Sequence, residues 1–543
     1  MGMTEGSEPK EEGLRGLPQV VHLGFAGSRR LFDGVVPEGY LERVEGYLAE
    51  VIGGLAGELG FEAHHFLCGI SQVAIGADFC FTRVLAAKGI PQRIFLPQHR
   101  DEYLNAVGSA GVADFSEEER REAMRLLDGE QVIQERVVSE AADRRMRFEG
   151  TNIEIIRHSD VILCLVREGA DGKPGGTLEM ISRAKAWNTP LLTVTVGVGD
   201  GGPVFRREWT WNLKEGKAEG YEPPRHPEVL REIVVPEDHR ELMPKLADIL
   251  PTVKSHASSD ALRRSGFFKV AARVIIGTHI LATMCAVVGL KLDSWKSALL
   301  FLLLLEIGLL SWGYFTHYRL HHQEAAPRWA LSRLIAEICR SALALGKLHV
   351  SPEYLHALPF PAFLKPFLRT VETLHLRDTR RRVGDWKEIR EQYVAGRLRG
   401  KGGQITFYER EAAKANRLLG IAGKTFEVCS RLAIAATVIK MVLVVILLCD
   451  VGGGFVVTKG LLGMLAVVLP VLAVAALSLA AANDLEARAH TFEEMGEFLL
   501  KQEKRLGAAM SEREYARLVM ETETRLLGET VNWFSRRSFT GVA

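Results

Sequence analysis

The chain has 543 residues, a formal net charge of +1 and an apolar share of 47%. The near-zero charge argues against a protein that binds nucleic acid through bulk positive charge, so no nucleic-acid partner is expected. The seven cysteines are dispersed and include no C-x-x-C pair, which argues against a disulfide framework or a zinc site and fits a reducing cytosol.

The first part of the chain is expected to contain a short tail and an α/β domain. Residues 1–17 are acidic and glycine-rich and lack the regions of a signal peptide, so we expect a disordered tail. Residues 18–200 alternate short apolar runs with helical patterns, which favours a doubly wound, Rossmann-like parallel sheet. The expected strands are 20–25, 64–68, 93–97, 161–166 and 191–196. Residues 98–150 are a charged insertion, which we expect to be helical in its second half.

Three glycine-bearing loops are expected to leave the carboxyl ends of these strands and to enter helices. They carry the candidate ligand-binding residues Gly24, Gly27, Ser28 and Arg29; Gly69, Gly76 and Asp78; and Gly175, Gly176, Thr177 and Glu179. Glycine lets backbone N–H groups approach an anion, and a helix N-terminus carries positive potential. Ser28 and Thr177 add hydroxyl groups, and Arg29 can pair with a phosphate. The loops therefore predict a phosphate-bearing ligand, with purely structural turns as the alternative.

The expected strand order brings two of these loops together. In a doubly wound sheet the first and fourth strands are neighbours, and ligands bind where the strand order reverses between them. We therefore expect the first and third loops to face one another across a crevice. The first loop lacks the third glycine of the dinucleotide fingerprint, so an ordinary dinucleotide site is not predicted.

Four apolar segments of membrane-spanning length follow, and they come in two pairs. They are residues 270–290, 297–318, 432–449 and 460–482. Short connections make each pair a helical hairpin, and basic residues are concentrated outside the hairpin turns. Buried hairpins of a large soluble protein are the alternative interpretation.

The same pattern predicts the remaining organisation of the chain. A linker at 201–261 leads to a first hairpin at 262–320, a cytosolic helical region at 321–430, a second hairpin at 431–483 and C-terminal cytosolic helices at 484–543. By the positive-inside rule both termini are expected on the cytoplasmic side of the membrane. An apolar stripe at helical spacing in the last region favours a packing seam or a homo-oligomer.

Two charges interrupt the apolar segments, Glu306 in the second and Lys440 in the third. A charge at the centre of a span costs roughly 2.5 to 3.5 kcal/mol on insertion scales. Opposite charges at matching depth predict a pair that ties the hairpins together, as a gating latch, a pore lining or a static contact. His317 and His321 have the i, i+4 spacing of metal ligands, but without an acidic third ligand we expect an interfacial pair and no metal site.

The α/β region resembles the SLOG superfamily, which is related to the DNA-processing protein DprA and to the LOG cytokinin-activating phosphoribohydrolases. The resemblance covers about residues 18–200 and is carried by Gly24-x-x-Gly27-x-Arg29, Asp114-Phe115, Gly76-Ala-Asp78, Ser159-Asp160-Val-Ile-Leu and Gly175-Gly-Thr177-x-Glu179. It implies a domain that senses or processes nucleotides or nucleotide-derived ligands, with no further cofactor.

The remainder resembles the SLATT effector modules, which pair transmembrane hairpins with cytosolic helices beside SLOG domains in bacterial conflict systems. The matching pieces are Trp329-x-x-x-Arg333-x-x-Ala336-Glu337-x-x-Arg340 and Gln404-Ile-x-x-Tyr408. The resemblance implies permeabilisation of the membrane after ligand sensing, often as antiphage defence.

An enzyme is the alternative to a sensor. LOG enzymes carry the motif P-G-G-x-G-T-x-x-E, whose glutamate helps to cleave an N-glycosidic bond. This chain has Pro174-Gly-Gly-Thr177-Leu-Glu179, with the glutamate one residue closer to the threonine. One residue on a helix turns a side chain by ~100°. We therefore expect a non-catalytic sensor, with Glu179 as a weak catalytic candidate of a membrane-anchored phosphoribohydrolase-like enzyme.

Overall fold

A computed structural model gives the fold of two compact units. The α/β unit comprises Met1–Val253 and Gly346–Val383, and the helical unit comprises Lys254–Leu345 and Gly384–Ala543. The structure describes residues 14–32, 37–62, 64–107, 113–139, 141–170, 172, 175–199, 202–212, 214–215, 221–231, 233–236, 243–289, 296–322, 325–346, 348, 350, 352, 354–380, 385–448 and 456–539.

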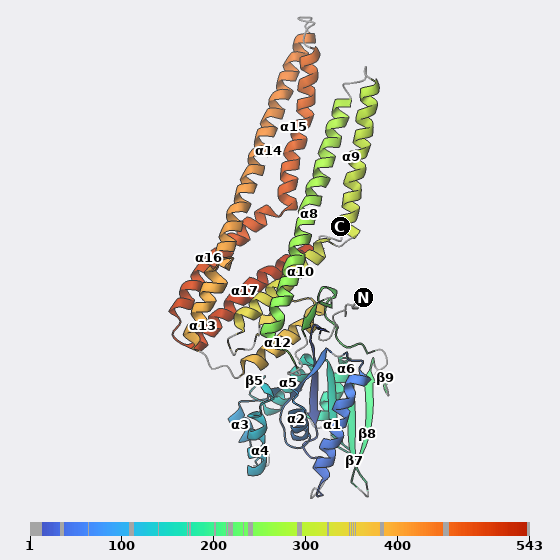
Figure 1. Ribbon diagram of the computed structural model, residues 1–543, viewed down its shortest axis with the longest axis vertical. Coiled ribbons are helices and arrows are strands. Elements are labelled where there is room, and N and C mark those ends of the chain that lie inside the picture. Colours follow the sequence, from blue (N-terminus) through green and yellow to red (C-terminus); the bar gives the residue numbers. More distant parts are fainter. Residues whose placement is uncertain are drawn as a thin grey trace, which may run out of the picture. The chain divides into compact units, whose positions relative to one another are not determined.

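A mostly parallel sheet forms the centre of the α/β unit, as the sequence predicts (Figure 1). In the described residues it has eight strands in the order β5-β4-β3-β2-β6-β7-β8-β9. The strands from β2 to β7 pair in parallel, whereas β8 and β9 pair antiparallel at one edge. The strands are β2 (Gln19–Gly27), β3 (His65–Ser71), β4 (Gln92–Leu96), β5 (Val132–Val137), β6 (Val161–Arg167), β7 (Leu191–Gly199), β8 (Gly202–Trp211) and β9 (Lys214–Glu215).

Helices cover both faces of this sheet. One core cluster joins Leu23, Phe25 and Leu163 to the buried sides of α1 (Tyr40–Glu58) and α2 (Ala77–Ala87). A second cluster joins Ala26, Ile162 and Cys164 to α5 (Arg144–His158) and α6 (Thr177–Ala186). Because successive strand residues point to opposite faces, a strand buried on both faces is a continuous apolar run, which is the pattern of β6. The shorter helices are α3 (Arg100–Leu104), α4 (Glu117–Leu127), α7 (Glu228–Arg231) and α11 (Tyr354–Ala357).

Three parts of this unit differ from the expectation. The insertion at 98–150 contributes strand β5 as well as helices, and the expected linker at 201–261 contributes β8 and β9. Strands β5 and β8 carry several charged residues. β5 is an edge strand, and β9 pairs only with Thr210 and Trp211 of β8, so most of β8 also has a single partner. A strand with one partner needs only one buried face, so the apolar signal of both strands is weak. Of the expected tail, residues 1–13 lie outside the described residues, and Leu14–Gly16 forms β1, paired with β10 (Val234–Pro236).

Helix α12 (Lys365–Thr379) comes from the region expected to be cytosolic and helical, but it packs on the sheet. Thr370 Oγ1 accepts the backbone N–H of Val20 (3.0 Å), and Thr373 Oγ1 bonds His22 Nε2 (2.9 Å). Arg93 donates two hydrogen bonds to the carboxylate of Glu372, at 2.8 and 3.0 Å, with both side chains buried. These sheet residues lie near the amino ends of their strands, so α12 packs at the end of the sheet opposite the glycine loops.

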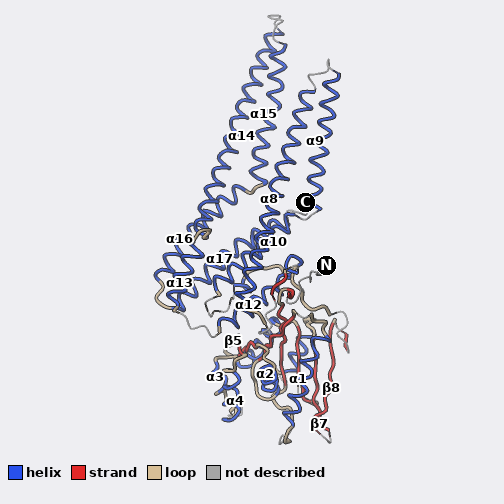
Figure 2. Tube along the Cα trace, viewed as in Figure 1, coloured by secondary structure: helices blue, strands red, loops and turns tan. Residues whose placement is uncertain are grey.

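The helical unit is built around two very long helices, α8 (Leu246–Gly289) and α14 (Gln404–Leu448), which run without a break in the described chain (Figure 2). At 1.5 Å per residue, helices of 44 and 45 residues are each roughly 65 Å long. The boundaries expected at 262 and 431 therefore fall inside continuous helices. The remaining elements are α9 (Lys296–His322), α10 (Ala325–Leu345), α13 (Trp386–Tyr393), a π-helical turn (Val394–Arg399), α15 (Val456–Ala482), α16 (Leu485–Ala508) and α17 (Glu512–Phe539).

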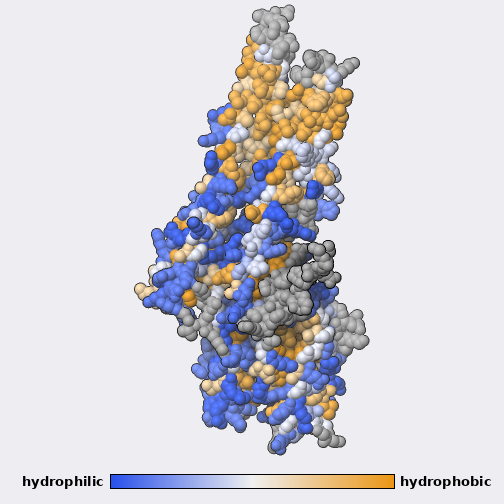
Figure 3. Space-filling model, viewed as in Figure 1, coloured by the Kyte–Doolittle hydropathy of each residue, from blue (hydrophilic) through white to orange (hydrophobic). Residues whose placement is uncertain are grey.

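Four helices of this unit are long and apolar enough to cross a membrane: α8, α9, α14 and α15. Within the most apolar stretch of each, at most 17% is buried inside the chain. Figure 3 shows apolar side chains gathered over the upper parts of these helices. A soluble protein rarely exposes so large an apolar surface, so these are the properties of a membrane protein.

Candidate functional site

The point where the strand order reverses lies between β2 and β6, which pair in parallel as the sequence predicts. The backbone N–H of Ser28, just after β2, donates to the carbonyl of Leu165 (2.9 Å). The backbone N–H of Arg167, at the end of β6, donates to Ser28 Oγ (3.1 Å). The ends of these two strands are therefore joined directly at the carboxyl edge of the sheet, and Ser28 is part of that joint.

Two glycines allow the first loop to pack against the start of α2. A methyl group at Gly27 would lie 2.1 Å from Ala77 Cβ. A methyl group at Gly76, which has a φ of +83°, would lie 2.4 Å from the carbonyl oxygen of Arg29. The backbone N–H of Ala77 donates to the carbonyl of Ser28 (3.2 Å). Both glycines are therefore explained by close backbone packing at the edge where the candidate site lies.

Asp78 connects the first and second loops through hydrogen bonds to their backbone. Its side chain is buried, and its carboxylate accepts backbone N–H groups of Gln72, Gly27 and Ala74. Burial raises the pKa of this carboxyl to about 7, although the three N–H donors oppose the shift. Asp78 is therefore buried behind the two loops and holds their backbone in place.

The third loop is held by Glu179, on the first turn of α6. Glu179 accepts the backbone N–H of Gly175 with one oxygen and the guanidinium of Arg183 with the other. Burial raises the pKa of Glu179, but the Gly175 N–H and Arg183 outweigh it and bring the pKa below its ordinary value. A carboxylate that is bonded at both oxygens and stays ionised is a poor general acid. In this loop, residues 171, 173 and 174 lie outside the described residues.

Two residues that the motifs did not single out connect the second and third loops. Asn152, on α5, donates to the carbonyl of Gly175 (3.1 Å) and accepts from Gln72 Nε2 (2.8 Å). Both side chains are buried. The sequence gives one signal for Asn152: it is a polar residue on the buried side of α5, one turn before Ile155 and Ile156.

Arg29 and the start of α6 are accessible to solvent at this edge. The Arg29 side chain is 41% exposed and lies 4.0 Å from Asp114, which also pairs with Arg144. The Arg29 guanidinium also lies 5.9 Å from the ring centre of Phe115. Gly176 and Thr177 begin α6 and are half-buried. A half-exposed guanidinium and a helix N-terminus can each hold an anion such as a phosphate.

Two predicted ligand residues lie inside strands. Gly24 is within β2, where a methyl group would lie 2.3 Å from Ser159 Oγ. Gly69 is within β3, where a methyl group would lie 2.1 Å from Leu85 Cδ1. Both strands continue past the point at which the loops were expected to begin, so these glycines serve packing.

Replacement of Gly175 by alanine tests the geometry of the third loop. Gly175 has a φ of +73°, and a methyl group would lie 2.9 Å from Phe148 Cβ. We expect the α/β unit to lose about 1 to 2 kcal/mol, the cost of a left-handed alanine, with faster amide exchange in peptides from α5 and α6. Gly172→Ala is the matched control, because its methyl group meets nothing closer than 4.0 Å. Equal exchange in the two variants would contradict this account.

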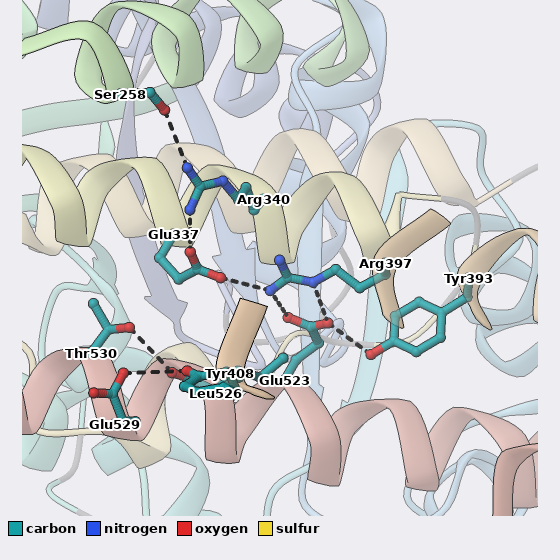
Figure 4. Close-up of polar contacts among 10 residues, drawn as sticks. All are labelled: Ser258, Glu337, Arg340, Tyr393, Arg397, Tyr408, Glu523, Leu526, Glu529 and Thr530. Carbon is teal, nitrogen blue, oxygen red and sulfur yellow. Dashed lines mark hydrogen bonds and ion pairs between the residues drawn. The ribbon is translucent and has the colours of Figure 1, made fainter. Parts of the chain in front are cut away.

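The helical unit has a polar centre of its own, which Figure 4 shows. Arg397, on the π-helical turn, donates to Glu337 of α10 (2.9 Å) and to Glu523 of α17 (2.9 and 3.0 Å). Tyr393 donates to Glu523 (2.8 Å), and Arg340 pairs with Glu337. Burial raises the pKa of Glu337, but the two arginines lower it to about 2. A π-helical turn is rare and is often found at functional sites.

This polar centre forms one wall of a cavity of about 800 Å³. All residues that carry the second resemblance, except Ile405, line this cavity: Trp329, Arg333, Ala336, Glu337, Arg340, Gln404 and Tyr408. A motif that is split between two distant stretches of sequence is therefore gathered around one cavity.

Glu306 and Lys440 lie on α9 and α14, and both are half-buried. In the part of the chain that the structure describes, no ion pair joins them. Lys440 Nζ lies instead 3.4 Å from where a methyl group on Gly463 of α15 would stand. A contact between Glu306 and Lys440 of neighbouring subunits stays a prediction.

Comparison with known proteins adds no family assignment. No family model matches the chain, and no curated protein matches it.

Proposed function

We propose that the protein is a ligand-gated membrane effector. The α/β unit binds a nucleotide or nucleotide-derived anion, and the helical unit then permeabilises the membrane. The observation that carries this proposal is the place of α12, which lies between the two pairs of membrane-length helices in sequence but belongs to the α/β unit. The chain crosses between the units at Val253, Leu345 and Val383, so a shift in the α/β unit reaches both pairs through the backbone.

The carboxyl edge between β2 and β6 supports the ligand-binding part of the proposal. A reversal of strand order between neighbouring parallel strands is where Rossmann-like sheets bind nucleotides. Arg29 and the start of α6 supply positive charge and N–H donors at that edge, and Asp78, Asn152 and Glu179 hold the loops in place. The ligand would be held by Arg29, Gly176 and Thr177.

The exposed apolar helices support the effector part. A pore or a bilayer defect needs several copies of such helices, so we propose a homo-oligomer whose subunits meet in the membrane. The resemblance to SLOG and SLATT modules favours a bacterial inner membrane, cytoplasmic termini and a role in antiphage defence.

A membrane-anchored phosphoribohydrolase is less well supported. Its catalytic glutamate would be Glu179, whose two oxygens are bonded to Gly175 and Arg183. We therefore expect no release of base from nucleoside monophosphates by the purified protein. Base release that is abolished in Glu179→Ala would replace the sensor by this enzyme.

A ligand screen tests the sensing step. The full-length protein in neutral detergent is heated with a library of nucleotides and cyclic or modified nucleotides, and ligands are found by the rise in unfolding temperature. We expect Arg29→Gln to weaken the best ligand roughly 10- to 100-fold, the value of a charge-assisted hydrogen bond. Arg125→Gln is the matched control, since Arg125 is 72% exposed on α4. Equal affinities of the two variants would remove the sheet edge as the site.

A further inference from the structure

The helical unit contains a second cavity, of about 520 Å³, whose two ends differ in chemistry. One end is apolar, lined by Leu418, Ile421 and Ala422 of α14 and by Ala476, Leu479 and Ala480 of α15. The other end is cationic, with Lys269 and Arg273 of α8, Lys414 of α14 and Arg488 of α16, against the single carboxylate of Glu411. An apolar chamber with a positive mouth matches an amphiphilic anion.

The cationic mouth is shared with the larger cavity. Lys269, Glu411, Lys414 and Arg488 line both cavities. Glu411 pairs with Arg488 (3.3 Å), whereas no ion pair is found for Lys269 or Lys414 among the described residues. Positive charge therefore exceeds negative charge at the junction of the two cavities.

Aromatic rings hold arginines of this region in place without neutralising them. The Arg488 guanidinium lies 5.3 Å from the ring centre of Phe492, and the Arg333 guanidinium lies 4.5 Å from that of Trp533. Burial lowers the pKa of Arg488, and Arg333 and Arg537 add to this effect although Glu411 opposes it. A cation–π contact orients a guanidinium but leaves its charge available to an anion.

The cavity lies next to the polar ends of the membrane-length apolar segments. Ala476, Leu479 and Ala480 belong to the last two turns of the apolar segment Gly460–Ala482, and Asn483 follows it directly. Lys269 directly precedes the apolar run that begins at residue 270 of α8. On α14 the lining residues, which end at Thr425, precede the apolar segment 432–449. The cavity therefore lies at the end of the apolar segments on α8 and α15 and on the polar side of the apolar segment on α14, which is the side where lipid headgroups would lie.

We propose that this cavity binds an anionic phospholipid. The phosphate lies among Lys269, Lys414 and Arg488, and part of one acyl chain lies between α14 and α15. Basic pockets between membrane helices on the cytoplasmic side recognise such headgroups. A bound lipid would join α8, α14, α15 and α16 at one point and make the assembly of the helical unit depend on lipid composition. The proposal requires membrane insertion but no ligand at the sheet edge, so the two can fail separately.

Lipid titration of the purified full-length protein tests this assignment. Neutral detergent micelles are doped with dioleoylphosphatidylglycerol or with dioleoylphosphatidylcholine, and binding is measured as the rise in unfolding temperature against lipid fraction. We expect stabilisation by the anionic lipid alone. Lys269→Gln and Lys414→Gln should each shift the titration midpoint roughly fivefold to higher lipid, the effect of one basic residue. Lys424→Gln, an exposed lysine on α14 outside both cavities, should shift it by less than twofold.

Two further arms distinguish the lipid from a soluble phosphate. Ala476→Leu places three more carbons in the apolar part of the cavity, so it should weaken binding of the lipid. Inorganic phosphate should not change the unfolding temperature through this cavity. Stabilisation by millimolar phosphate that equals that by the lipid and is lost in Lys414→Gln would assign the cationic residues to a soluble anion. Equal titrations with both lipids, or equal midpoints for Lys414→Gln and Lys424→Gln, would also overturn the proposal.

Discussion

Replacement of Glu372 by alanine is expected to destabilise the α/β unit by about 3 to 5 kcal/mol. Glu372 and Arg93 are buried and joined by two hydrogen bonds, so the variant leaves a guanidinium charge inside the protein without its carboxylate. The Arg93–Glu372 contact joins α12 to β4. A second ion pair, between Arg369 of α12 and Asp160, joins the same helix to the residue just before β6. Hydrogen exchange should become a hundredfold faster or more in peptides from β2, β4 and α12.

Two controls separate the loss of charge pairing from the loss of a side chain. Glu117→Ala removes a carboxylate that is 77% exposed and pairs with Arg120 on α4, and it should cost less than about 1 kcal/mol. The double variant Arg93→Met, Glu372→Leu removes both charges and should recover most of the stability. Exchange that stays slow in Glu372→Ala would show that α12 is not held to the sheet by this pair.

Replacement of Arg397 by alanine is the second large effect that we expect. Arg397 lies between the carboxylates of Glu337 and Glu523, of which Glu523 is fully buried. Its loss leaves two buried negative charges facing each other, so the helical unit should lose about 3 to 5 kcal/mol. The measurement is again peptide-resolved exchange, here in α10, α13 and α17.

Arg399→Ala is the matched control for this effect, two residues away on the same π-helical turn. Arg399 is 56% exposed and pairs with Glu503, and an exposed ion pair contributes little to stability, so amide exchange in Arg399→Ala should stay close to that of the wild type. If the two variants exchange equally, the polar centre in Figure 4 does not hold the helical unit together.

Much of the sheet follows from apolar runs in the sequence, because β2, β6 and β7 are buried on both faces. The apolar pattern does not predict β5 and β8, which carry charges. β5 and most of β8 have a single neighbouring strand, so their apolar pattern is weak. The membrane-length helices were found because length and apolarity suffice to identify them. The sequence does not predict that two of these helices continue far beyond the apolar segments, because no break in the helical pattern marks the end of a span.

Contacts between segments that are distant in sequence cannot be predicted from the sequence pattern. The amphipathic pattern of α12 shows that one side is buried but not what covers it, and its partner Val20 is 350 residues away. The same holds for Asn152 and Gln72, whose roles depend on the meeting of two loops. Glycine motifs located the sheet edge, but they did not separate glycines that pack, such as Gly24 and Gly69, from those that shape loops.

Gated leakage is the central claim, and one measurement tests it most directly. The protein is reconstituted into liposomes of phosphatidylethanolamine and phosphatidylglycerol that contain a self-quenching dye, and the ligand found by the screen is added outside. We predict rapid dye release with the wild-type protein and with Arg125→Gln, and little release with Arg29→Gln at the same ligand concentration. Liposomes that stay sealed when the ligand is bound, or that leak equally without it, would contradict the account.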